Sequence, residues 1–369
     1  MARWRSSILN PKIDLYDVVA VEQLRRQRRL DPQLIRQLRN RFLKRFDSDE
    51  AALEGFPEAS RISLHSLELF RRFESGIDGA TKLLFRTSSD LLIESVLLRI
   101  ATGRNTLCVS SQVGCAAACG FCATGKMGIA RNLSVAEILD QVQQCGQVLA
   151  SEGRRLQNIV FMGMGEPFHN ECNLFAAVER LVATDHFNRS PASILVSTVG
   201  VADAMLRFAE QFPKVNLALS LHSASQEKRE QIIPLAKKYS LQQLRETLVE
   251  INQVQQREFM IEYLMLAGVN DSTNDAIELI RWLEPMQVHV NLIPYNPIQD
   301  APHLHGSSSE VINRFATLLK AEGLKTTIRY SLGSDIAAAC GQLVRSENRQ
   351  RVMNRMPQDQ GLAFTKACE

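Results

Sequence analysis

Long hydrophobic runs are missing from this 369-residue sequence. No N-terminal stretch has the apolar region of a secretory signal peptide, and no run of about 18 apolar residues could form a transmembrane helix. We therefore predict neither a signal peptide nor a membrane span, and we expect a cytoplasmic protein. Internal repeats and low-complexity segments are also absent. The apolar fraction of 45% is that of an ordinary globular protein, and this length can bury one large core or two small ones.

The sequence also lacks a strong excess of charge of one sign, because it contains 43 Lys and Arg residues and 40 Asp and Glu residues. The distribution is nevertheless uneven. Basic residues outnumber acidic ones between Arg3 and Arg45, and a sparser basic stretch runs from Arg345 to Arg355. Basic ends on a nearly neutral body suit a polyanionic partner such as RNA. Solvated helix faces would have the same composition, so charge alone does not choose between the two interpretations.

Local patterns divide the chain into three parts. Residues 1–90 look helical and basic, and five apolar residues at helical spacing predict a core there: Leu34, Ile35, Leu38, Phe42 and Phe46. From about residue 105, short apolar segments alternate with amphipathic ones, one of which begins with the capping-box sequence Ser134-Val-Ala-Glu137. We predict a small N-terminal helical accessory domain (1–90), a main domain (91–345) and a C-terminal tail (346–369).

The main domain has the pattern of an α/β protein. Its apolar segments predict seven strands, at residues 107–110, 158–164, 194–198, 216–222, 260–266, 288–294 and 326–330. Alternation of strands and helices predicts βα units with a parallel sheet. About six repeats after the first strand favour a partial (β/α)6 barrel. A doubly wound open sheet is the alternative, but no G-x-G-x-x-G sequence follows a strand.

Three of the eight cysteines are spaced C-x3-C-x2-C, at Cys115, Cys119 and Cys122. Without a secretion signal, so many cysteines indicate a reducing compartment and metal or redox chemistry. The Gly and Ala residues between them allow the backbone to curl around a small object. Iron–sulfur clusters prefer thiolate ligands, and three ligands leave one iron of a four-iron cluster open. Ferredoxins and zinc fingers have other spacings, so the alternative is three structural cysteines that cluster by chance.

Polar motifs follow the predicted strands at the ends where barrel enzymes gather their chemistry. The first is Gly163-Met-Gly-Glu-Pro167, in which the glycines allow close backbone approach and Glu166 can bind an ammonium group. Further polar residues end later strands: Ser197, Ser220, His222 and Asn296. Each alone would be interpreted as a turn residue. Together they predict a polar ring around one ligand that carries ribose hydroxyls and a sulfonium-bearing amino acid.

Two more cysteines have suggestive positions. Cys108 lies on the predicted strand that leads to the cysteine triplet, and Cys340 lies among small residues after the last strand. Their spacing alone does not pair them.

The triplet, with Phe121 directly before its last cysteine, resembles the radical S-adenosylmethionine (SAM) superfamily, in which the open iron chelates SAM. A set of motifs resembles one branch of it, the RlmN/Cfr family, which methylates a ring carbon of adenine in 23S ribosomal RNA and in some cases modifies transfer RNA. These motifs are Thr106-Leu-Cys-Val-Ser-Ser-Gln-Val-Gly-Cys115, Arg131-Asn-Leu133, Phe161-Met-Gly-Met-Gly-Glu-Pro167, Asn291-Leu-Ile-Pro-Tyr-Asn296 and Ala338-Ala-Cys-Gly-Gln-Leu343. The resemblance spans residues 90–345 and implies a partial (β/α)6 radical-SAM barrel.

The resemblance also implies roles for individual residues. Cys115, Cys119 and Cys122 would hold a [4Fe-4S] cluster. The SAM ligands would be Gly165, Glu166, Ser197, Ser220, Leu221, His222 and Asn296. Cys340 would become the methylated cysteine, Cys108 would be its partner thiol, and Glu94 would be the proton acceptor. An electron donor such as flavodoxin or ferredoxin would reduce the cluster, and we expect the enzyme to be a monomer.

The chemistry that the resemblance implies uses both cysteines. One SAM first methylates Cys340, and the reduced cluster then cleaves a second SAM to a 5′-deoxyadenosyl radical. That radical takes a hydrogen atom from the methyl group, the resulting carbon radical adds to the adenine ring, and Glu94 removes the ring proton. The Cys108 thiolate then attacks the Cys340 sulfur, which releases the product and leaves a disulfide to be reduced. The target base must leave its stack to take part.

Several alternatives stay open at the level of sequence. Another radical SAM enzyme, such as a glycyl-radical activase, needs the triplet but not both Cys108 and Cys340. A non-catalytic iron–sulfur protein that binds RNA or senses redox state needs no SAM ring. The target carbon, C2 or C8, is also open, although residues 212–222 resemble the Cfr branch, which targets C8. The N-terminal region lacks a motif of the family's usual accessory domain, so the choice of RNA is undetermined.

Overall fold

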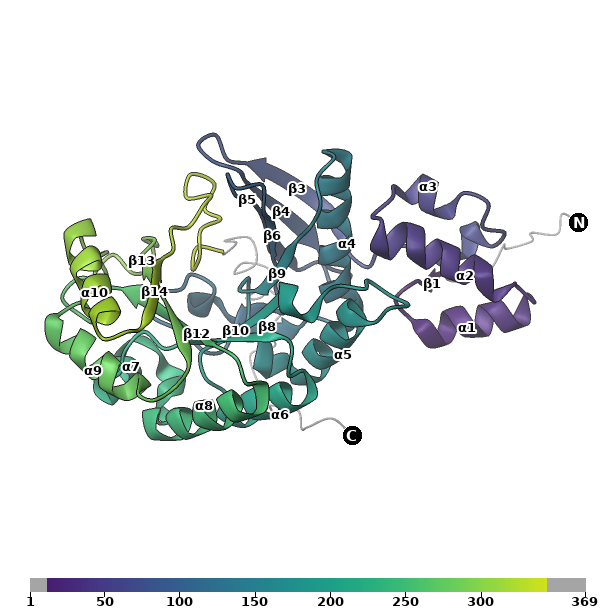
Figure 1. The fold of residues 1–369 in the computed structure, drawn as a ribbon. Coiled ribbons are helices and arrows are strands. Elements are labelled where there is room, and N and C mark those ends of the chain that lie inside the picture. Colours follow the sequence, from purple (N-terminus) through teal and green to yellow (C-terminus); the bar gives the residue numbers. More distant parts are fainter. Residues whose placement is uncertain (1–11, 344–369) are drawn as a thin grey trace, which may run out of the picture.

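A single ten-stranded sheet runs through the computed structural model, which describes residues 12–343 (Figure 1). Its strand order is β14-β13-β12-β11-β10-β9-β6-β5-β4-β3, and the seven strands from β14 to β6 are parallel. The parallel strands are β6 (Asn105–Cys108), β9 (Asn158–Phe161), β10 (Ile194–Thr198), β11 (Asn216–Ser220), β12 (Phe259–Met265), β13 (Val288–Pro294) and β14 (Lys325–Ile328). All seven predicted parallel strands are thereby confirmed, with ends that shift by a few residues.

Six crossovers connect these parallel strands, and each contains at least one helix. The helices are α4 (Val135–Ser151), α5 (Glu171–Val182), α6 (Ala202–Gln211), α7 (Gln226–Ile232), α8 (Leu241–Gln255), α9 (Thr273–Leu283) and α10 (Ser309–Ala321). A doubly wound sheet reverses its strand order at a switch point, whereas here the strands follow one another in sequence order. The predicted α/β partial barrel is therefore confirmed. The predicted capping box at Ser134 and Glu137 begins α4.

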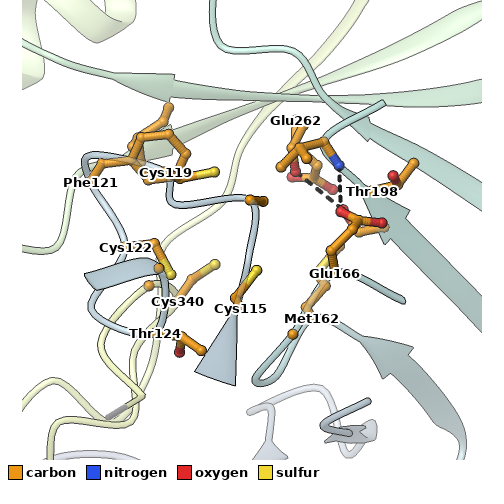
Figure 2. Close-up of a pocket in the computed structure, with 18 of the residues that line it drawn as sticks. Cys115, Cys119, Phe121, Cys122, Thr124, Met162, Glu166, Thr198, Glu262 and Cys340 are labelled. Carbon is orange, nitrogen blue, oxygen red and sulfur yellow. Dashed lines mark hydrogen bonds between the residues drawn. The ribbon is translucent and has the colours of Figure 1, made fainter. Parts of the chain in front are cut away.

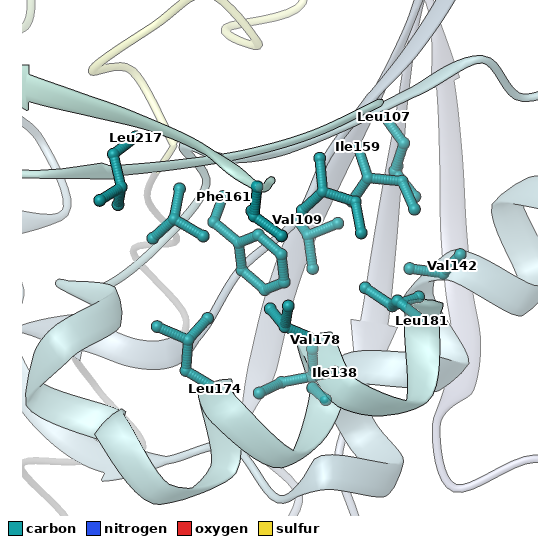
Figure 3. Packing of buried hydrophobic residues seen from close by; sticks show 14 of the residues in the cluster. Leu107, Val109, Ile138, Val142, Ile159, Phe161, Leu174, Val178, Leu181 and Leu217 are labelled. Carbon is teal, nitrogen blue, oxygen red and sulfur yellow. The ribbon is translucent and has the colours of Figure 1, made fainter. Parts of the chain in front are cut away.

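The two faces of the sheet have different roles. On the outer face, Leu107, Ile159 and Phe161 pack against helices α4 and α5 (Figure 3). Burying one such side chain stabilises the fold by about 1.5–3 kcal/mol, so this layer fixes the helices on the sheet. On the inner face, a separate apolar cluster contains Val160, Leu195 and Ala218, with Cys108 and Met162 beside it. Strand register places Cys108 opposite Val160 and Val160 opposite Leu195.

The N-terminal part begins with helices, as predicted. These are α1 (Val18–Gln27), α2 (Pro32–Arg39), a π-helical turn (Asn40–Lys44) and α3 (Asp49–Leu53). Of the predicted core residues, Ile35, Leu38, Phe42 and Phe46 are buried, and Leu34 packs partly buried against them. A short parallel pair, β1 (Ile13–Asp14) and β2 (Ile62–Ser63), joins the two ends of this helical unit.

The prediction that residues 1–90 are helical throughout is wrong after residue 61. Strands β3 (Glu68–Glu74), β4 (Ala80–Arg86) and β5 (Leu92–Arg99) extend the barrel sheet in antiparallel order. The helical interpretation failed because β4 and β5 are buried on both faces and β3 is exposed on both, so none of the three shows a two-residue alternation. The turn sequence Ser75-Gly-Ile-Asp-Gly79 was the available hairpin signal.

The predicted basic ends have a mixed outcome. In α1, Arg25 and Arg26 both bind Glu22, at 2.7 and 2.8 Å, so part of the N-terminal charge is neutralised within the helix. The basic stretch from Arg345 to Arg355 and the predicted tail 346–369 lie outside the described residues. Across residues 12–343, no helix combines the length and apolar character needed to cross a membrane.

Candidate active site

The cysteine triplet lies on a tightly curled loop. The loop leaves strand β7 (Gln112–Cys115) and ends before β8 (Gly128–Asn132), which pairs with β7. Ala118 has a left-handed backbone, with φ 54°. Gly125 crosses Cys119 so closely that a Cβ atom would lie 2.9 Å from the Cys119 amide nitrogen. The curl therefore depends on the left-handed backbone of Ala118 and on Gly125, which follows the triplet, whereas Gly120 between the cysteines would have room for a Cβ atom.

All three cysteines of the loop line one cavity of about 970 Å³ at the carboxyl ends of the parallel strands (Figure 2). Burial raises the pKa of the Cys115 thiol to about 12 and also raises the pKa values of Cys119 and Cys122. Each thiol would therefore lose its proton only in exchange for a metal.

The donor set fits a cluster better than a single metal ion. In a cubane, each of three thiolates binds a different iron, so the three sulfurs need not converge on one point. Among the described residues, no three His, Cys, Asp or Glu side chains are arranged to hold one ion. Three thiols around one cavity, of which Cys115 and Cys119 are buried and Cys122 is partly buried, are therefore suited to an iron–sulfur cluster and not to mononuclear zinc.

Glu166 lies on the opposite wall of the same cavity. Its Oε2 accepts a hydrogen bond from the Val199 amide at 2.9 Å (Figure 2). Its Oε1 accepts one from the Phe168 amide at 3.1 Å. Burial nevertheless raises the pKa of this carboxyl to about 7, against the effect of the Val199 amide. A buried carboxylate without a cation is costly, so the site favours a cationic ligand such as an ammonium group.

Glycines allow the Glu166 turn to pack against the strand that leads to the cysteine loop. Gly165 has φ +105°, and a Cβ atom there would lie 2.7 Å from the Gln112 side chain. A Cβ atom at Gly163 would lie 2.7 Å from the Val109 backbone. The predicted close approach of the Gly-x-Gly segment is therefore present.

Ends of the next two strands contribute neutral polar groups to the cavity. The hydroxyl oxygens of Ser197 and Ser220 lie 3.3 Å apart. His222 Nδ1 accepts a hydrogen bond from the Leu264 amide at 3.0 Å, and burial lowers the pKa of this imidazole to about 3. The ring is therefore neutral, and its proton is on Nε2. The ring also packs edge-on against Phe121, with centroids 4.8 Å apart.

Two predicted SAM ligands do not line this cavity. The Leu221 side chain is fully buried, and its carbonyl accepts a hydrogen bond from Arg229 Nε at 3.1 Å. Asn296 Nδ2 donates to the Cys340 carbonyl at 3.1 Å and to Ser331 Oγ at 3.0 Å. Asn296 therefore holds the loop that carries Cys340.

Cys340 lines two cavities at once. It lies in the wall of the cavity with the cysteine triplet, and it also lines a second cavity of about 1610 Å³ together with Cys108. Burial raises the pKa of Cys108 to about 12, and Cys340 raises it further. Burial likewise raises the pKa of Cys340 to about 11, and Arg329 opposes this shift. The structure thus brings together two cysteines that lie 232 positions apart in the sequence.

Glu94 lies on β5, on the same face of the sheet as Cys108. Register pairs Val96 with Cys108, and Glu94 is two residues along the strand from Val96, which corresponds to a diagonal neighbour of Cys108 on the same face. The Glu94 side chain is fully buried, and Lys82 Nζ lies 3.6 Å from its Oε1. Lys82 in turn donates to the Ala337 carbonyl of the Cys340 loop at 3.0 Å.

Sequence reasoning missed three charged residues of the site. Glu262 is buried on β12, lines the triplet cavity and lies 3.6 Å from Arg329 Nη1. Arg329 is the second of these residues, and Lys82, which contacts Glu94, is the third. The signal was available for Glu262 and Lys82, because each is a charged residue inside an otherwise apolar strand, and such a residue is seldom buried without a function or a partner.

The domain that this fold and cysteine loop define is that of a radical SAM enzyme, and residues 109–280 match the model of the Radical SAM superfamily. The chain is 66% identical to a probable RNA methyltransferase of Rhodopirellula baltica, over 92% of this chain and 90% of that protein. It is 43% identical to a probable dual-specificity RNA methyltransferase RlmN of Protochlamydia amoebophila, over 78% and 80% of the two chains. The chain therefore belongs to the RlmN/Cfr family of radical SAM RNA methyltransferases.

A solved structure agrees with this assignment. The fold is similar to that of a radical SAM methyltransferase from Sphaerobacter thermophilus, with a TM-score of 0.83 and 37% identity, over 90% of this chain and 97% of that one. The enzymatic interpretation is thus confirmed, and the non-catalytic alternative is not favoured.

Proposed function

We propose that this radical SAM RNA methyltransferase methylates a ring carbon of adenine, C2 or C8, in 23S ribosomal RNA through a methylated Cys340. The observation that carries the proposal is the position of Cys340 between two cavities. One cavity contains the cysteine triplet and the candidate SAM ligands, and the other contains Cys108. A thiol that receives a methyl group on one side and delivers it on the other needs access to both.

The triplet cavity would hold a [4Fe-4S] cluster on Cys115, Cys119 and Cys122, with SAM beside it. When bound, these groups supply one-electron chemistry that abstracts a hydrogen atom. Glu166 would bind the ammonium group of SAM, and Gly165, which packs closely against Gln112, would position the Glu166 turn. Ser197 and Ser220 would bind the ribose hydroxyls. The neutral His222 would offer its Nε2 proton, while Leu221 and Asn296 would act through backbone and loop position.

The second cavity would receive the target adenine. Its inner wall is apolar, with Val160, Leu195 and Met260 beside Cys108. An unstacked base needs such a pocket, because enzymes that modify a nucleobase take it out of the helix. Glu94, on the same sheet face as Cys108, would accept the ring proton after the methyl carbon of Cys340 has bonded to the base.

Cys108 would then complete the cycle. Its thiolate would attack the Cys340 sulfur as the bond between that sulfur and the methyl-derived carbon breaks. The released carbon would take up a proton and the unpaired electron of the adduct would return to the oxidised cluster, so a Cys108–Cys340 disulfide would remain. External reductant must return both cysteines to thiols before the next turnover. An electron donor such as flavodoxin or ferredoxin would serve the cluster. We further propose that the protein acts as a cytoplasmic monomer and that transfer RNA is a candidate second substrate.

Separate cysteine variants test the proposal. Cys340→Ala should neither accept a methyl group nor react with RNA. Cys108→Ala should still be methylated and still bond to the base, so a covalent protein–RNA species should accumulate in cells and appear on denaturing gels. Cys145→Ala is the matched control, because this fully buried thiol lies in the outer-face core. Absence of an RNA-linked band from Cys108→Ala would contradict the proposed cycle.

Two measurements separate the alternatives that remain. Formation of 5′-deoxyadenosine on reduction with dithionite in the presence of SAM checks radical chemistry by itself. Mass mapping of methyladenosine isomers in 23S ribosomal RNA and transfer RNA from a deletion strain then decides between C2 and C8 and identifies the nucleotide.

A further inference from the structure

Exposed apolar side chains gather near the second cavity. Among the described residues, eight large hydrophobic side chains are exposed. Five of them lie on the β3–β4 hairpin or in the wall of the second cavity: Leu69, Phe70, Ile77, Ile100 and Tyr330. Scattered apolar side chains need no explanation, but a gathered group marks a binding surface.

Cationic side chains alternate with the aromatic rings on this surface. The Arg86 guanidinium lies 4.4 Å from the Phe70 ring centroid, and Arg71 lies 5.9 Å from Phe70 and 5.7 Å from Phe73. Lys82 Nζ lies 5.4 Å from the Phe73 centroid. On the wall of the second cavity, Arg104 and Arg329 accompany Tyr330.

The hairpin surface is continuous with the proposed catalytic residues. Register pairs Phe73 with Lys82, and Arg71 with Leu84, which is itself opposite Glu94. These side chains therefore share the sheet face of Glu94 and Cys108. Lys82 also binds the Ala337 carbonyl, three residues before Cys340. A ligand that lies on the hairpin therefore leads directly to the Cys340 loop.

Acidic neighbours only partly neutralise the surface. Glu68 and Asp90 lie 3.5 and 3.6 Å from Arg86, and all three side chains are at least 30% exposed, so water and salt weaken both pairs. Arg71 has no ion pair within residues 12–343. Its charge is therefore available to a phosphate group.

We propose that the β3–β4 hairpin and the rim of the second cavity form a platform for single-stranded RNA next to the target nucleotide. Unpaired bases would stack on Phe70 and Tyr330, and Arg71 and Arg104 would contact phosphates. Aromatic platforms with interleaved cations are the usual means of holding single strands. This proposal rests on the proposed function, because it supplies the RNA that places a base beside Cys340.

Variants on the hairpin test the platform, with unmodified 23S ribosomal RNA as the probe. Phe70→Ala should weaken RNA binding and raise KM for RNA about 10-fold. Arg71→Gln should weaken binding and lower the slope of log affinity against log salt by about 1. Both should leave iron content and RNA-independent SAM cleavage unchanged. The controls are Ile277→Ala, which is as exposed as Phe70 (38% each), and Arg314→Gln on the outer helix α10; neither should change RNA affinity.

The outcomes are distinguishable from failure of the proposed function. If the wild type cleaves SAM and methylates RNA but the hairpin variants match their controls, the platform is wrong and the proposed function stands. If light scattering shows a dimer that Phe70→Ala dissociates while RNA affinity is unchanged, the edge strand pairs two copies and the platform is also wrong. A wild type without activity on RNA would contradict the proposed function itself.

Arg229 is the largest fully buried side chain in the described chain. Its Nε donates to the Leu221 carbonyl at 3.1 Å, and its Nη2 donates to the Val199 carbonyl at 2.5 Å. Its Nη1 is buried and has no hydrogen-bond partner in residues 12–343. Val199 lines the triplet cavity, so the guanidinium contacts a residue of the cavity wall. The helix that carries Arg229 also meets the cysteine loop, where the Gly120 amide donates to the Ile232 carbonyl at 2.8 Å.

We infer that Arg229 is the electrostatic partner of the cluster and that its unpartnered Nη1 faces cluster sulfur. An Arg side chain stays charged, and reduction makes a thiolate-bound cluster more negative. Net charge and hydrogen bonds to sulfur set the potential of such clusters. Arg229 therefore favours the reduced state. A SAM carboxylate is the competing partner for Nη1.

Redox titration of reconstituted protein without SAM, followed by electron paramagnetic resonance, tests this inference. Arg229→Gln should lower the reduced-to-oxidised ratio about 10-fold at a fixed potential, which is 59 mV for one electron. Arg229→Lys should retain most of the ratio, and it decides the matter if Arg229→Gln is insoluble. An unchanged potential in Arg229→Gln, or a 10-fold fall in Arg229→Lys, contradicts the inference. Weaker SAM binding at an unchanged potential would assign Nη1 to the carboxylate, whereas a wild type without iron would contradict the proposed function.

Discussion

Glu166 is a buried carboxyl whose surroundings favour the binding of a cation. Two backbone amides hold its oxygens in place, yet burial leaves its pKa at about 7. The group is therefore neutral below about pH 7 and ionised above it. A bound ammonium group would favour the ionised form and lower this pKa.

Replacement of Glu166 by Gln should weaken SAM binding about 10- to 100-fold, which corresponds to the 1.5–3 kcal/mol of a hydrogen bond to a charged group. Wild-type SAM affinity should fall as pH decreases below about 7, because the carboxyl then binds a proton instead of the ammonium. The Gln variant should not show this decrease. Calorimetric titration between pH 6 and 8 checks both statements, and equal affinity of the two proteins at pH 8 would remove Glu166 from the SAM site.

At the scale of elements, the cysteine loop supplies the three proposed cluster ligands. Cys119→Ala removes one of these thiols, and the loop has no fourth cysteine; Cys340 lines the same cavity but comes from the segment after β14. We expect loss of the brown chromophore, iron content near zero and no SAM cleavage. Circular dichroism should show the fold retained, because the barrel core lies on the other face of the sheet. A variant that still binds four irons would contradict the ligand assignment.

The N-terminal helical unit is attached to helix α4 through His65, a partly exposed side chain that bridges one exposed and one buried carboxylate. His65 Nδ1 lies 2.8 Å from Asp140, and its Nε2 lies 3.0 Å from Asp49. Burial alone would lower the His65 pKa, but the two carboxylates raise it to about 10. Because the folded-state pKa lies above the unfolded value of 6.5, this stabilisation is complete below pH 6.5 and is lost as pH rises through about 10.

His65→Gln should therefore lower the free energy of unfolding by about 1–3 kcal/mol near neutral pH, between the values for exposed and buried ion pairs, because Asp140 is buried but His65 and Asp49 are partly exposed. The difference from wild type should shrink between pH 7 and 10. Urea unfolding at several pH values measures it, and a constant difference across that range would show that His65 contributes through packing alone.

Elements differed in how well the sequence predicted them. The parallel strands were evident because burial on both faces makes them continuous apolar runs between helices. Strands β3 to β5 were missed because their burial reflects neighbours that the sequence does not place beside them. For the same reason, the contacts of Lys82 and Arg329 could not be predicted, since each depends on side chains far away in the sequence.

At the scale of the whole molecule, the sheet crosses the boundary that sequence patterns placed at residue 90. A fragment that begins at residue 91 would lack β3 and β4, expose the edge of β5 and uncover Leu97 and Ile93. Unpaired edges with apolar faces aggregate. We expect a larger insoluble fraction for this fragment than for the full chain when the two are expressed under the same conditions. A soluble, monomeric 91–369 fragment with a cooperative melting transition would show that the two parts fold independently.

The sheet is open between its edge strands β14 and β3, and the segment after β14 spans this opening (Figure 1). Asp335 binds the Gly76 amide at 2.8 Å, and the Gly333 amide binds Asp78 at 2.7 Å, so the segment is fastened to the hairpin turn. Further along, Gly341 and Leu343 are fastened to the cysteine loop at Ala123 and Thr124. Cys340 thus belongs to the segment that covers the opening between the two edge strands. In the proposed cycle, a displacement that moves the Cys340 sulfur from the triplet cavity toward Cys108 would also weaken these contacts across the opening of the sheet. The same segment would therefore control both the access of RNA and the order of the chemical steps.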